Sequence, residues 1–265
     1  MTFLKRSSIN FIQMKNIFLF LILISNVLIA QNTDSLFVSG NELYRNGAFE
    51  EAIKKYKEIE AQDVVSSELY LNLGNAYYKL NKVGPTIFYY EKALKLNPLN
   101  TDATNNLIFA KRLALDNIEE VPKTIFQKFN DTYLQKLSYN EWAMIVVLFS
   151  FLTALFFLLF YFSYSPTKKR IYFTTSMLSF IIFIFSIFIT YNQYKQTKNK
   201  KEAIVFAKKT TVRNAPTLNA EAIFTLHEGT KVVVLDTLDN WKKIKIADGK
   251  EGWIIADEIK LLKNF

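Results

Sequence analysis

Few residues in this 265-residue chain could do covalent chemistry. It has no cysteine and a single histidine, His227, so thiol nucleophiles, thiolate metal sites and most histidine-based catalysis are excluded. The carboxylates are scattered over helix surfaces, and the sequence has neither a nucleophile elbow nor a glycine-rich phosphate loop. His227 is expected at a turn, without a second ligand beside it. We therefore expect no cofactor, no metal site and no enzymatic activity.

Two tryptophans near the C-terminus could take part in recognition. Trp241 and Trp253 have flat, amphipathic rings that could stack against a glycan or a peptide. The alternative is that both rings pack in the core or at the rim of a small domain, because aromatic side chains chiefly supply buried area. We favour the alternative and retain the stacking platform as a hypothesis.

Two apolar runs dominate the middle of the chain. No charged residue occurs from Trp142 to Thr167 or from Ile171 to Tyr194, and the short basic loop Ser165–Arg170 joins the runs. A helix needs about 20 apolar residues to cross a hydrocarbon layer of about 30 Å. A buried helical hairpin in a soluble core is the alternative, but two adjacent runs of this length and purity argue against it. We predict a transmembrane hairpin over residues 142–194.

Residues 1–30 have the pattern of a secretory signal peptide. Basic residues precede an apolar run from Ile17 to Ile29, and Ala30 is small enough for a cleavage site. An uncleaved anchor is the alternative, which the shortness of the run disfavours. In either case the following chain crosses the membrane and the hairpin returns it to the same side. We therefore expect a bacterial inner-membrane protein with both soluble parts in the periplasm.

Residues 31–120 repeat themselves. The residue types recur at an offset of about 34 positions, as in Gly40 and Gly74, Tyr44 and Tyr78, and Tyr56 and Tyr90. This period, with small residues where helices cross and aromatic residues beside them, is that of the tetratricopeptide repeat, a helix–turn–helix unit. We predict two repeats and a closing helix from Asp102 to Leu115 that covers the last apolar face.

Resemblance to this repeat family implies a concave groove for peptides or partner proteins. By the spacing of the family, the groove residues are Phe37, Asn41, Tyr44, Asn72, Asn75, Tyr78 and Asn105. Some members grip a terminal carboxylate with lysines and asparagines. Here Phe37 and Asp102 occupy the lysine positions, so such a clamp is not expected. Alternatively, the asparagines only cap or solvate helices.

Residues 121–141 form a bridge between the repeats and the hairpin. Their apolar residues share one helical face, with lysines providing a basic contrast: Ile125, Phe126, Phe129, Tyr133, Leu134 and Leu137 against Lys123, Lys128 and Lys136. This pattern predicts a short amphipathic helix in the lipid headgroup region. It could equally be a last helix packed on the repeats. Ser138 and Glu141 have capping-box spacing directly before the first apolar run.

After a polar linker, residues 195–203, the sequence period changes to two over residues 204–265. Strands are expected at 231–235, 241–246 and 253–255, with Asp248 and Gly249 as a two-residue hairpin turn. Three patterns resemble the bacterial SH3 domain: Val-Arg-x-x-Pro early, Leu-x-x-Gly-x-x-Val midway and Asp-Gly-Lys-x-Gly-Trp-Ile late. The resemblance implies a small all-β barrel that binds peptides or cell-wall components.

The net charge of +9 does not indicate nucleic-acid binding. The excess of Lys and Arg lies beside the apolar segments, where basic residues meet lipid headgroups. A nucleic-acid-binding protein would concentrate it on a folded domain.

Taken together, the sequence predicts a multidomain membrane protein with an all-α repeat solenoid, a two-helix membrane hairpin and a small all-β barrel. This order resembles the BatE-type proteins of the bacterial aerotolerance operon, and the segments 73–79 and 87–94 carry much of the resemblance. It implies a membrane complex with von Willebrand A-domain proteins of the same operon and a MoxR-type ATPase. The favoured hypothesis is a non-enzymatic scaffold that binds proteins. The alternative is a cell-wall sensor or anchor that binds peptidoglycan through its SH3-like domain.

Overall fold

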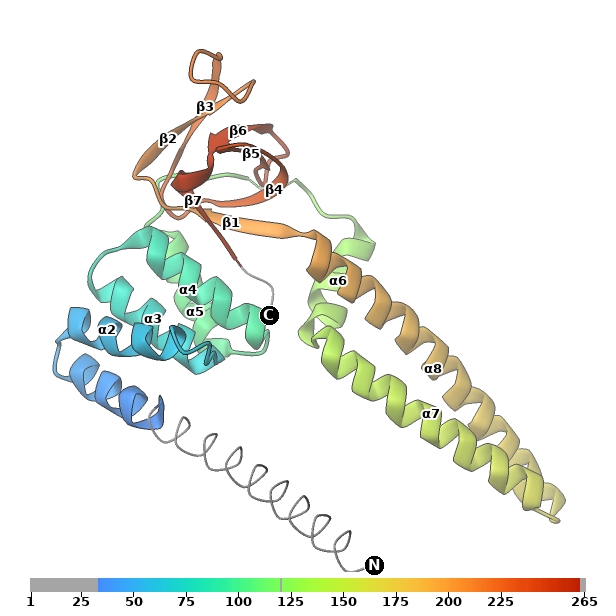
Figure 1. Ribbon diagram of the computed structural model, residues 1–265. Helices are drawn as coiled ribbons and strands as arrows, with labels where there is room; N and C mark the ends of the chain where they lie inside the picture. The colour runs from blue at the N-terminus through green and yellow to red at the C-terminus, as the bar shows by residue number, and fades with distance from the viewer. Residues whose placement is uncertain (1–32, 120, 263–265) are drawn as a thin grey trace, which may run out of the picture. The chain divides into compact units, whose positions relative to one another are not determined.

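The computed structural model describes residues 33–119 and 121–262 (Figure 1). The predicted signal peptide, residues 1–30, lies outside the described residues. The chain divides into two compact units, with the boundary between Lys82 and Val83.

In its described part, the first unit is a stack of antiparallel helices. Residues 33–45 are helical and are followed by α2 (Phe49–Glu60) and α3 (Ser67–Lys79). A Cβ added to Gly40 would lie 2.5 Å from Cε1 of the buried Tyr56, so only glycine fits where these helices cross. At this crossing the contact confirms the prediction of a small residue where helices cross and an aromatic residue beside it.

The second unit begins with the helix pair α4 (Val83–Leu96) and α5 (Thr101–Lys111), which pack against each other. Pro85 lies in the first turn of α4, where a missing N–H is tolerated. The helix ends at Leu96, directly before Asn97 and Pro98. The side chain of Asn100 then caps α5 by accepting a hydrogen bond from the backbone N of Ala103 at 2.9 Å.

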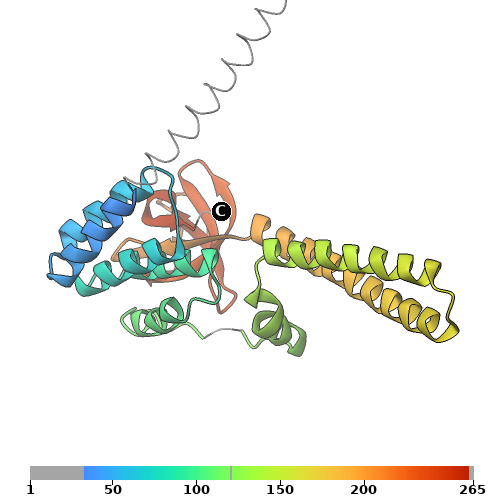
Figure 2. The same ribbon diagram turned by 90° about the horizontal axis from the view of Figure 1, so that it is seen from below.

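Next come α7 (Tyr139–Phe162) and α8 (Pro166–Asn199), which lie side by side in both views (Figures 1 and 2). The predicted capping box is confirmed, since Ser138 and Glu141 exchange hydrogen bonds at the start of α7. The predicted basic loop is shorter than expected. Pro166 is the first residue of α8 because its fixed φ suits that position, so the basic residues 168–170 lie within the first two turns of the helix.

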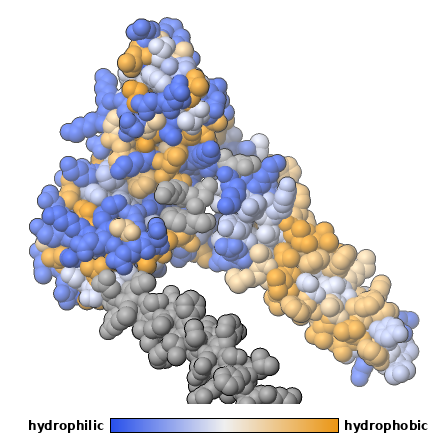
Figure 3. Space-filling model, in the orientation of Figure 1, coloured by the Kyte–Doolittle hydropathy of each residue, from blue (hydrophilic) through white to orange (hydrophobic). Residues whose placement is uncertain are grey.

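Both helices are long and apolar enough to cross a membrane. Small and polar residues of α8 are buried (Ser176, Ser179, Ser186 and Gln193), whereas large apolar residues on both helices are exposed. Figure 3 shows this apolar surface over α7 and α8, with hydrophilic side chains at the tip of the hairpin. Small residues inside and large apolar residues outside is the arrangement that helices adopt in lipid.

The bridge contains α6 (Ile125–Tyr133) and the short helix η1 (Leu134–Lys136). The carbonyl oxygen of Leu134 accepts hydrogen bonds from Trp142 Nε1 at 3.0 Å and from Gln193 Nε2 at 2.5 Å. The start of α7 and the last turns of α8 are thereby joined at one point. No residue of α6 is buried, and Phe126 is 87% exposed, so the described part of the chain leaves the apolar face of α6 uncovered.

The C-terminal part is an antiparallel seven-stranded sheet with strand order β3-β2-β6-β5-β4-β1-β7. Its elements are β1 (Lys201–Val205), β2 (Lys209–Arg213), β3 (Ala222–His227), β4 (Lys231–Leu238), β5 (Trp241–Lys245), β6 (Glu251–Ile255), the short helix η2 (Ala256–Glu258) and β7 (Ile259–Leu261). Its core contains Val212, Val232, Ile244 and Ile254. In place of the expected linker, α8 continues through Asn199 and β1 begins at Lys201.

The turn between β5 and β6 differs from the predicted two-residue turn. The backbone N of Gly249 donates to the carbonyl O of Ile246, and the backbone N of Ile246 donates to the O of Lys250, both at 3.0 Å. Ala247 and Asp248 are therefore the central residues, and Gly249, with φ +94°, follows them in the left-handed conformation. A two-residue turn of Asp248 and Gly249 needs φ above zero at both, whereas this wider turn needs it only at the glycine.

The sheet also contacts α4. The rings of Phe88 and Phe206 meet edge to face with centroids 5.4 Å apart, and the backbone N of Gly84 donates to Glu228 Oε2 at 3.2 Å. A Cβ added to Gly229 would lie 2.8 Å from Ile87 Cδ1. The second unit is thus held together by contacts between segments that are far apart in the sequence.

Candidate partner-binding sites

The first unit has a pocket of about 470 Å³ among its three helical segments. The residues that line it are Val38, Asn41, Tyr44, Arg45, Tyr56 and Asn72. The first four come from the helical residues 33–45, Tyr56 from α2 and Asn72 from α3. The helix–turn–helix packing of the repeat thus brings polar and aromatic side chains from all three segments to one hollow.

A hydrogen-bonded group fixes the polar side of this pocket. The Oδ1 atom of Asn41 accepts from the hydroxyl of Tyr56 at 2.7 Å and from Nδ2 of Asn72 at 3.0 Å. Burial, with a smaller effect of Tyr44, raises the pKa of Tyr56 to about 12, so its hydroxyl stays protonated and donates. Both lone pairs of Asn41 Oδ1 are in use, so Asn41 can offer a ligand only its Nδ2 donor.

The charge in the pocket is positive. Arg45 is exposed, and its side chain lines the same pocket as Asn41. A fork of N–H donors at the rim suits carbonyl or carboxylate oxygens. Tyr44 and Val38 supply apolar surface. The pocket can therefore hold an extended peptide through its backbone carbonyls or an acidic side chain.

The structure brings together only some of the predicted groove residues. Asn41, Tyr44 and Asn72 line the pocket, and the ring of Phe37 lies 6.0 Å from that of Tyr56. Asn75 and Tyr78 are partly buried on α3 outside the pocket lining, and Asn105 is exposed on α5 in the other unit. That these residues act as one groove remains a proposal.

Sequence reasoning did not assign Val38, Arg45 and Tyr56 to the pocket. Val38 and Arg45 lie three positions before and four positions after Asn41, so all three share one helical face. That spacing was available as a signal. Tyr56 was recognised only as a repeat position, because its contact with Asn41 depends on how two helices cross.

Trp241 and Trp253 share one face of the sheet. Trp241 pairs with Ile255, and Lys243 pairs with Trp253, which makes the two tryptophans diagonal neighbours on adjacent strands. Ile244 and Ile254 point to the opposite, buried face. Both tryptophans are half-buried, an exposure that fits the rim of the domain and leaves ring surface for a ligand.

Catalytic and metal-ligating groups are sparse in the described ranges, 33–119 and 121–262. No group of three or more His, Asp or Glu residues is placed there to hold a metal ion. His227 is the last residue of β3, directly before the turn in which sequence analysis placed it, and its Nδ1 lies 2.7 Å from Asp116 Oδ1. An Asp–His pair with no nucleophile assigned to it does not define a reaction.

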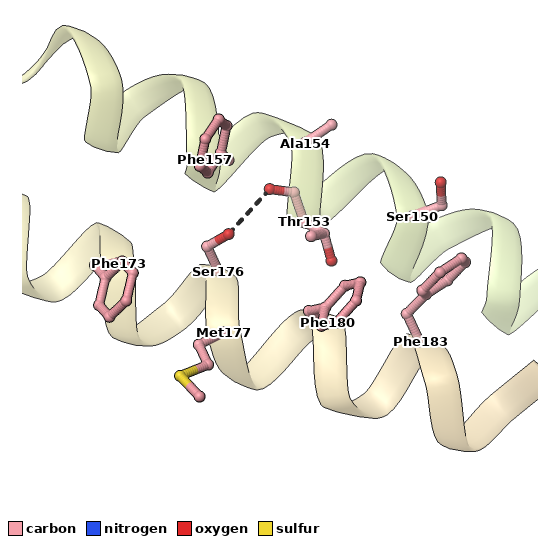
Figure 4. Close-up of a pocket in the computed structure, with 9 residues that line it drawn as sticks. All are labelled: Ser150, Thr153, Ala154, Phe157, Phe173, Ser176, Met177, Phe180 and Phe183. Carbon is pink, nitrogen blue, oxygen red and sulfur yellow. Dashed lines mark hydrogen bonds between the residues drawn. The ribbon is translucent and has the colours of Figure 1, made fainter.

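A further hollow, of about 460 Å³, lies between α7 and α8. Figure 4 shows Ser176 of α8 donating to the carbonyl oxygen of Thr153 of α7, with phenylalanine rings on either side. The hydroxyl of Thr153 donates to the carbonyl oxygen of Phe149 within its own helix, at 2.7 Å. Both hydroxyl groups therefore donate to backbone carbonyl oxygens of α7. We interpret the hollow as a feature of helix packing.

Comparison with protein-family models identifies both kinds of domain. Residues 67–100 match the tetratricopeptide repeat, residues 40–81 match a second model described as a TPR repeat, and residues 208–260 match the bacterial SH3 domain. Among curated proteins, none is similar enough to count as a match. The chain thus combines an all-α repeat region, two apolar helices that could span a membrane and an SH3-like sheet. Such domains are typically non-catalytic, and they support a role in protein interaction or cell-wall binding.

Proposed function

We propose that the protein is a non-enzymatic, membrane-anchored scaffold that presents two binding domains on one side of a bacterial inner membrane. The observation that carries the proposal is the shared acceptor at Leu134. Trp142 near the start of α7 and Gln193 near the end of α8 both donate to it. With both ends of the hairpin at one point, the domains before α7 and after α8 leave the membrane on the same side.

The pocket around Asn41 supports the partner-binding part of the proposal. Its fixed Asn41–Tyr56–Asn72 group and the exposed Arg45 form a donor-rich hollow of a size suited to a peptide segment. Tethering this pocket and the SH3-like domain to one membrane raises their local concentration for a shared partner. The scaffold therefore needs no single tight site.

In this proposal residues 1–30 direct export, residues 31–120 and 204–265 lie in the periplasm, and residues 142–194 are embedded in the membrane. The domain order and the BatE resemblance favour a complex with von Willebrand A-domain membrane proteins of an aerotolerance operon. Within that complex the protein holds its partners at the membrane surface.

The compartment is tested with topology reporters fused after Lys111, Lys168 and Leu262. We expect the first and third fusions to report the periplasm and the second to report the cytosol. A cytosolic signal after Leu262 together with a periplasmic one after Lys111 would contradict the proposal that both soluble domains lie on the same side of the membrane.

Partner binding is tested by photo-crosslinking in cells, with the crosslinking residue placed at Tyr44 in the pocket. The control position is Lys54, which is exposed and outside the pocket lining. We expect a discrete protein adduct from Tyr44 that disappears with Arg45→Glu. Identical adducts from both positions, or an adduct unaffected by Arg45→Glu, would contradict the assignment.

The half-buried pair of tryptophans favours a second candidate function, binding of peptidoglycan. Two diagonal rings on one face of the sheet could stack on sugar rings. Co-sedimentation of the detergent-solubilised chain with purified sacculi tests this candidate. Binding that is lost with Trp241→Ala, and retained with Trp142→Phe in the hairpin, would support it. Equal sedimentation of both variants would exclude the tryptophan face.

A further inference from the structure

The segment that follows α5 is extended and lies with one side on a surface. Its residues alternate regularly, with Ala114, Asp116 and Ile118 partly buried and Leu115, Asn117 and Glu119 exposed. Burial with a period of two is the pattern of an extended chain that rests on a neighbour. The segment belongs to neither a helix nor a strand. Its neighbour is the SH3-like domain.

Asp116 is held by three polar groups of the SH3-like domain. Its Oδ2 accepts from the backbone N of His227 at 2.7 Å and from the hydroxyl of Thr230 at 2.5 Å, and its Oδ1 lies 2.7 Å from Nδ1 of His227. The side chain of Asp116 is 12% exposed. Burial alone would raise the pKa of Asp116, but the hydrogen bonds from Thr230 and His227 outweigh it and lower the pKa. The site around Asp116 therefore suits an ionised carboxylate.

The residues on either side of Asp116 extend this contact along the domain. Ile118 packs against the core of the sheet. Further along, the backbone N of Val121 donates to the carbonyl oxygen of Ala247 at 3.2 Å, in the turn between β5 and β6. A charged anchor, an aliphatic side chain two positions later and a main-chain hydrogen bond are the elements with which domains recognise extended peptides.

We propose that the SH3-like domain has a peptide-binding site, formed by His227, Thr230 and the Ala247 carbonyl, which the chain's own residues 114–119 and Val121 occupy. The ligand class is an extended segment with a carboxylate followed two positions later by an aliphatic residue. An external partner of this chemistry competes with the internal segment. None of the contacts named above involves Trp241 or Trp253, so this site is separate from the tryptophan face.

Occupation by the chain itself controls access. The tether keeps the internal segment at a high effective concentration, so an external peptide binds only to the fraction of molecules in which the segment has left. Release of the segment therefore exposes the site and also frees the connection between α5 and the bridge.

The proposal is tested with the full-length chain in detergent micelles and a fluorescent peptide of residues 112–121. Two chains are compared with the wild type. The first, called the loosened chain, carries Asp116→Asn and Ile118→Ser, so its internal segment loses two anchors while the binding site stays intact. In the matched control, Leu115→Ser with Asn117→Ala, the substitutions fall on exposed positions of the same segment.

We expect the peptide to bind the loosened chain at least about tenfold more tightly than it binds the wild type or the control chain. The same peptide with Asp116→Asn should bind the loosened chain at least about tenfold more weakly. Hydrogen exchange should show residues 114–119 and Val121 released and β4 to β6 still protected.

Three outcomes would overturn the proposal. Peptide binding that is equal in all three chains would mean that no such site is opened. Binding that does not depend on the Asp116 carboxylate of the peptide would mean that His227 and Thr230 do not recognise this carboxylate. Lost protection of β4 to β6 in the loosened chain would mean that the segment is an integral part of the domain's core and not a ligand.

Discussion

The Nζ atom of Lys231 on β4 lies 2.7 Å from Oε2 of Glu91 on α4. The same ammonium group lies 3.3 Å from Oε1 of Glu202 on β1. Burial alone would lower the pKa of Lys231, but the two carboxylates outweigh it and raise the pKa. One lysine thus holds the carboxylates of a repeat helix and of the sheet together.

Removing that lysine should weaken the attachment of α4 to the sheet. Lys231→Met leaves Glu91 and Glu202, whose side chains are 9% and 10% exposed, without their shared cation. Loss of one partner of a buried ion pair costs about 3–5 kcal/mol when the remaining charge has no other partner. Lys111 still lies 3.6 Å from Glu91, and Lys200 and Lys95 still lie 2.9 Å and 3.4 Å from Glu202, so we expect a smaller loss, between about 1 kcal/mol and that range. We expect the denaturant midpoint of the full chain, followed by tryptophan fluorescence, to fall accordingly.

Lys243→Met is the control for this substitution. Lys243 lies on β5 and pairs with Glu251 at 3.1 Å, but both side chains are more than a third exposed. An exposed pair of this kind contributes at most about 1 kcal/mol. If both substitutions shift the midpoint equally, the burial of the Glu91–Lys231 pair has no energetic importance.

Acid should weaken the same attachment through Glu202. Burial by itself would raise the pKa of Glu202, but neighbouring lysines, with Lys231 foremost, lower it to about 2. A carboxylate whose pKa is lower in the folded chain stabilises it above its ordinary pKa of 4.5, and this contribution is lost as the pH falls toward 2. The shift corresponds to about 3 kcal/mol.

Thermal unfolding of the wild type and of Glu202→Gln, measured between neutral pH and pH 3, tests this assignment. We expect the variant to be less stable at neutral pH and the difference between the two chains to shrink below about pH 4. The control is Glu251→Gln, since Glu251 is 37% exposed and its lysine pairs are screened by solvent. A difference between wild type and Glu202→Gln that is constant with pH would contradict the assigned titration.

Periodicity explains why the domains could be predicted from the sequence. The hairpin follows from uncharged runs that only lipid or a large core could surround, and the repeat follows from residues such as Gly40 and Tyr56, whose types are fixed by the crossing of helices. Each of these signals is local, so each survives without knowledge of the tertiary structure.

Contacts between distant segments could not be predicted in this way. Glu91 and Lys231 are 140 positions apart, and each alone resembles an ordinary surface charge. Asp116 lies in a segment without periodicity long enough to suggest an extended ligand. In the candidate pocket, Asn41 was recognised from family spacing, whereas Arg45 was not, because nothing local distinguishes it from a solvated cation.

Gly229 offers a steric test of the contact between α4 and the sheet. Its φ is +91°, and an added Cβ would lie 2.8 Å from Ile87 Cδ1 and 3.0 Å from Val83 Cγ1. Gly229→Ala should therefore lower the free energy of unfolding by about 2–4 kcal/mol, because backbone strain and a steric clash act together.

Gly249→Ala is the matched control, because its φ is +94° and its nearest neighbour is 3.8 Å away. We expect it to cost only the strain, about 1 kcal/mol. Equal costs in denaturant titrations would show that α4 does not enclose Gly229.

The exposed face of α6 leads to a prediction about the membrane surface. Phe126 is 87% exposed and Ile125 is 84% exposed, although α6 is anchored by its own capping box and by the contacts of Leu134 with the hairpin. An apolar face that no described part of the chain covers, next to the end of a membrane hairpin, suits the boundary between headgroups and acyl chains.

In vesicles, the tryptophan of Phe126→Trp should be quenched by brominated lipid. It should also emit at shorter wavelength than the tryptophan of Asp131→Trp, on the opposite face. Asp131 makes solvent-exposed contacts, an ion pair with Lys123 and a hydrogen bond of 3.4 Å from Asn130 Nδ2, so this control costs little stability. Equal quenching at both positions would mean that α6 does not lie with this face in the lipid.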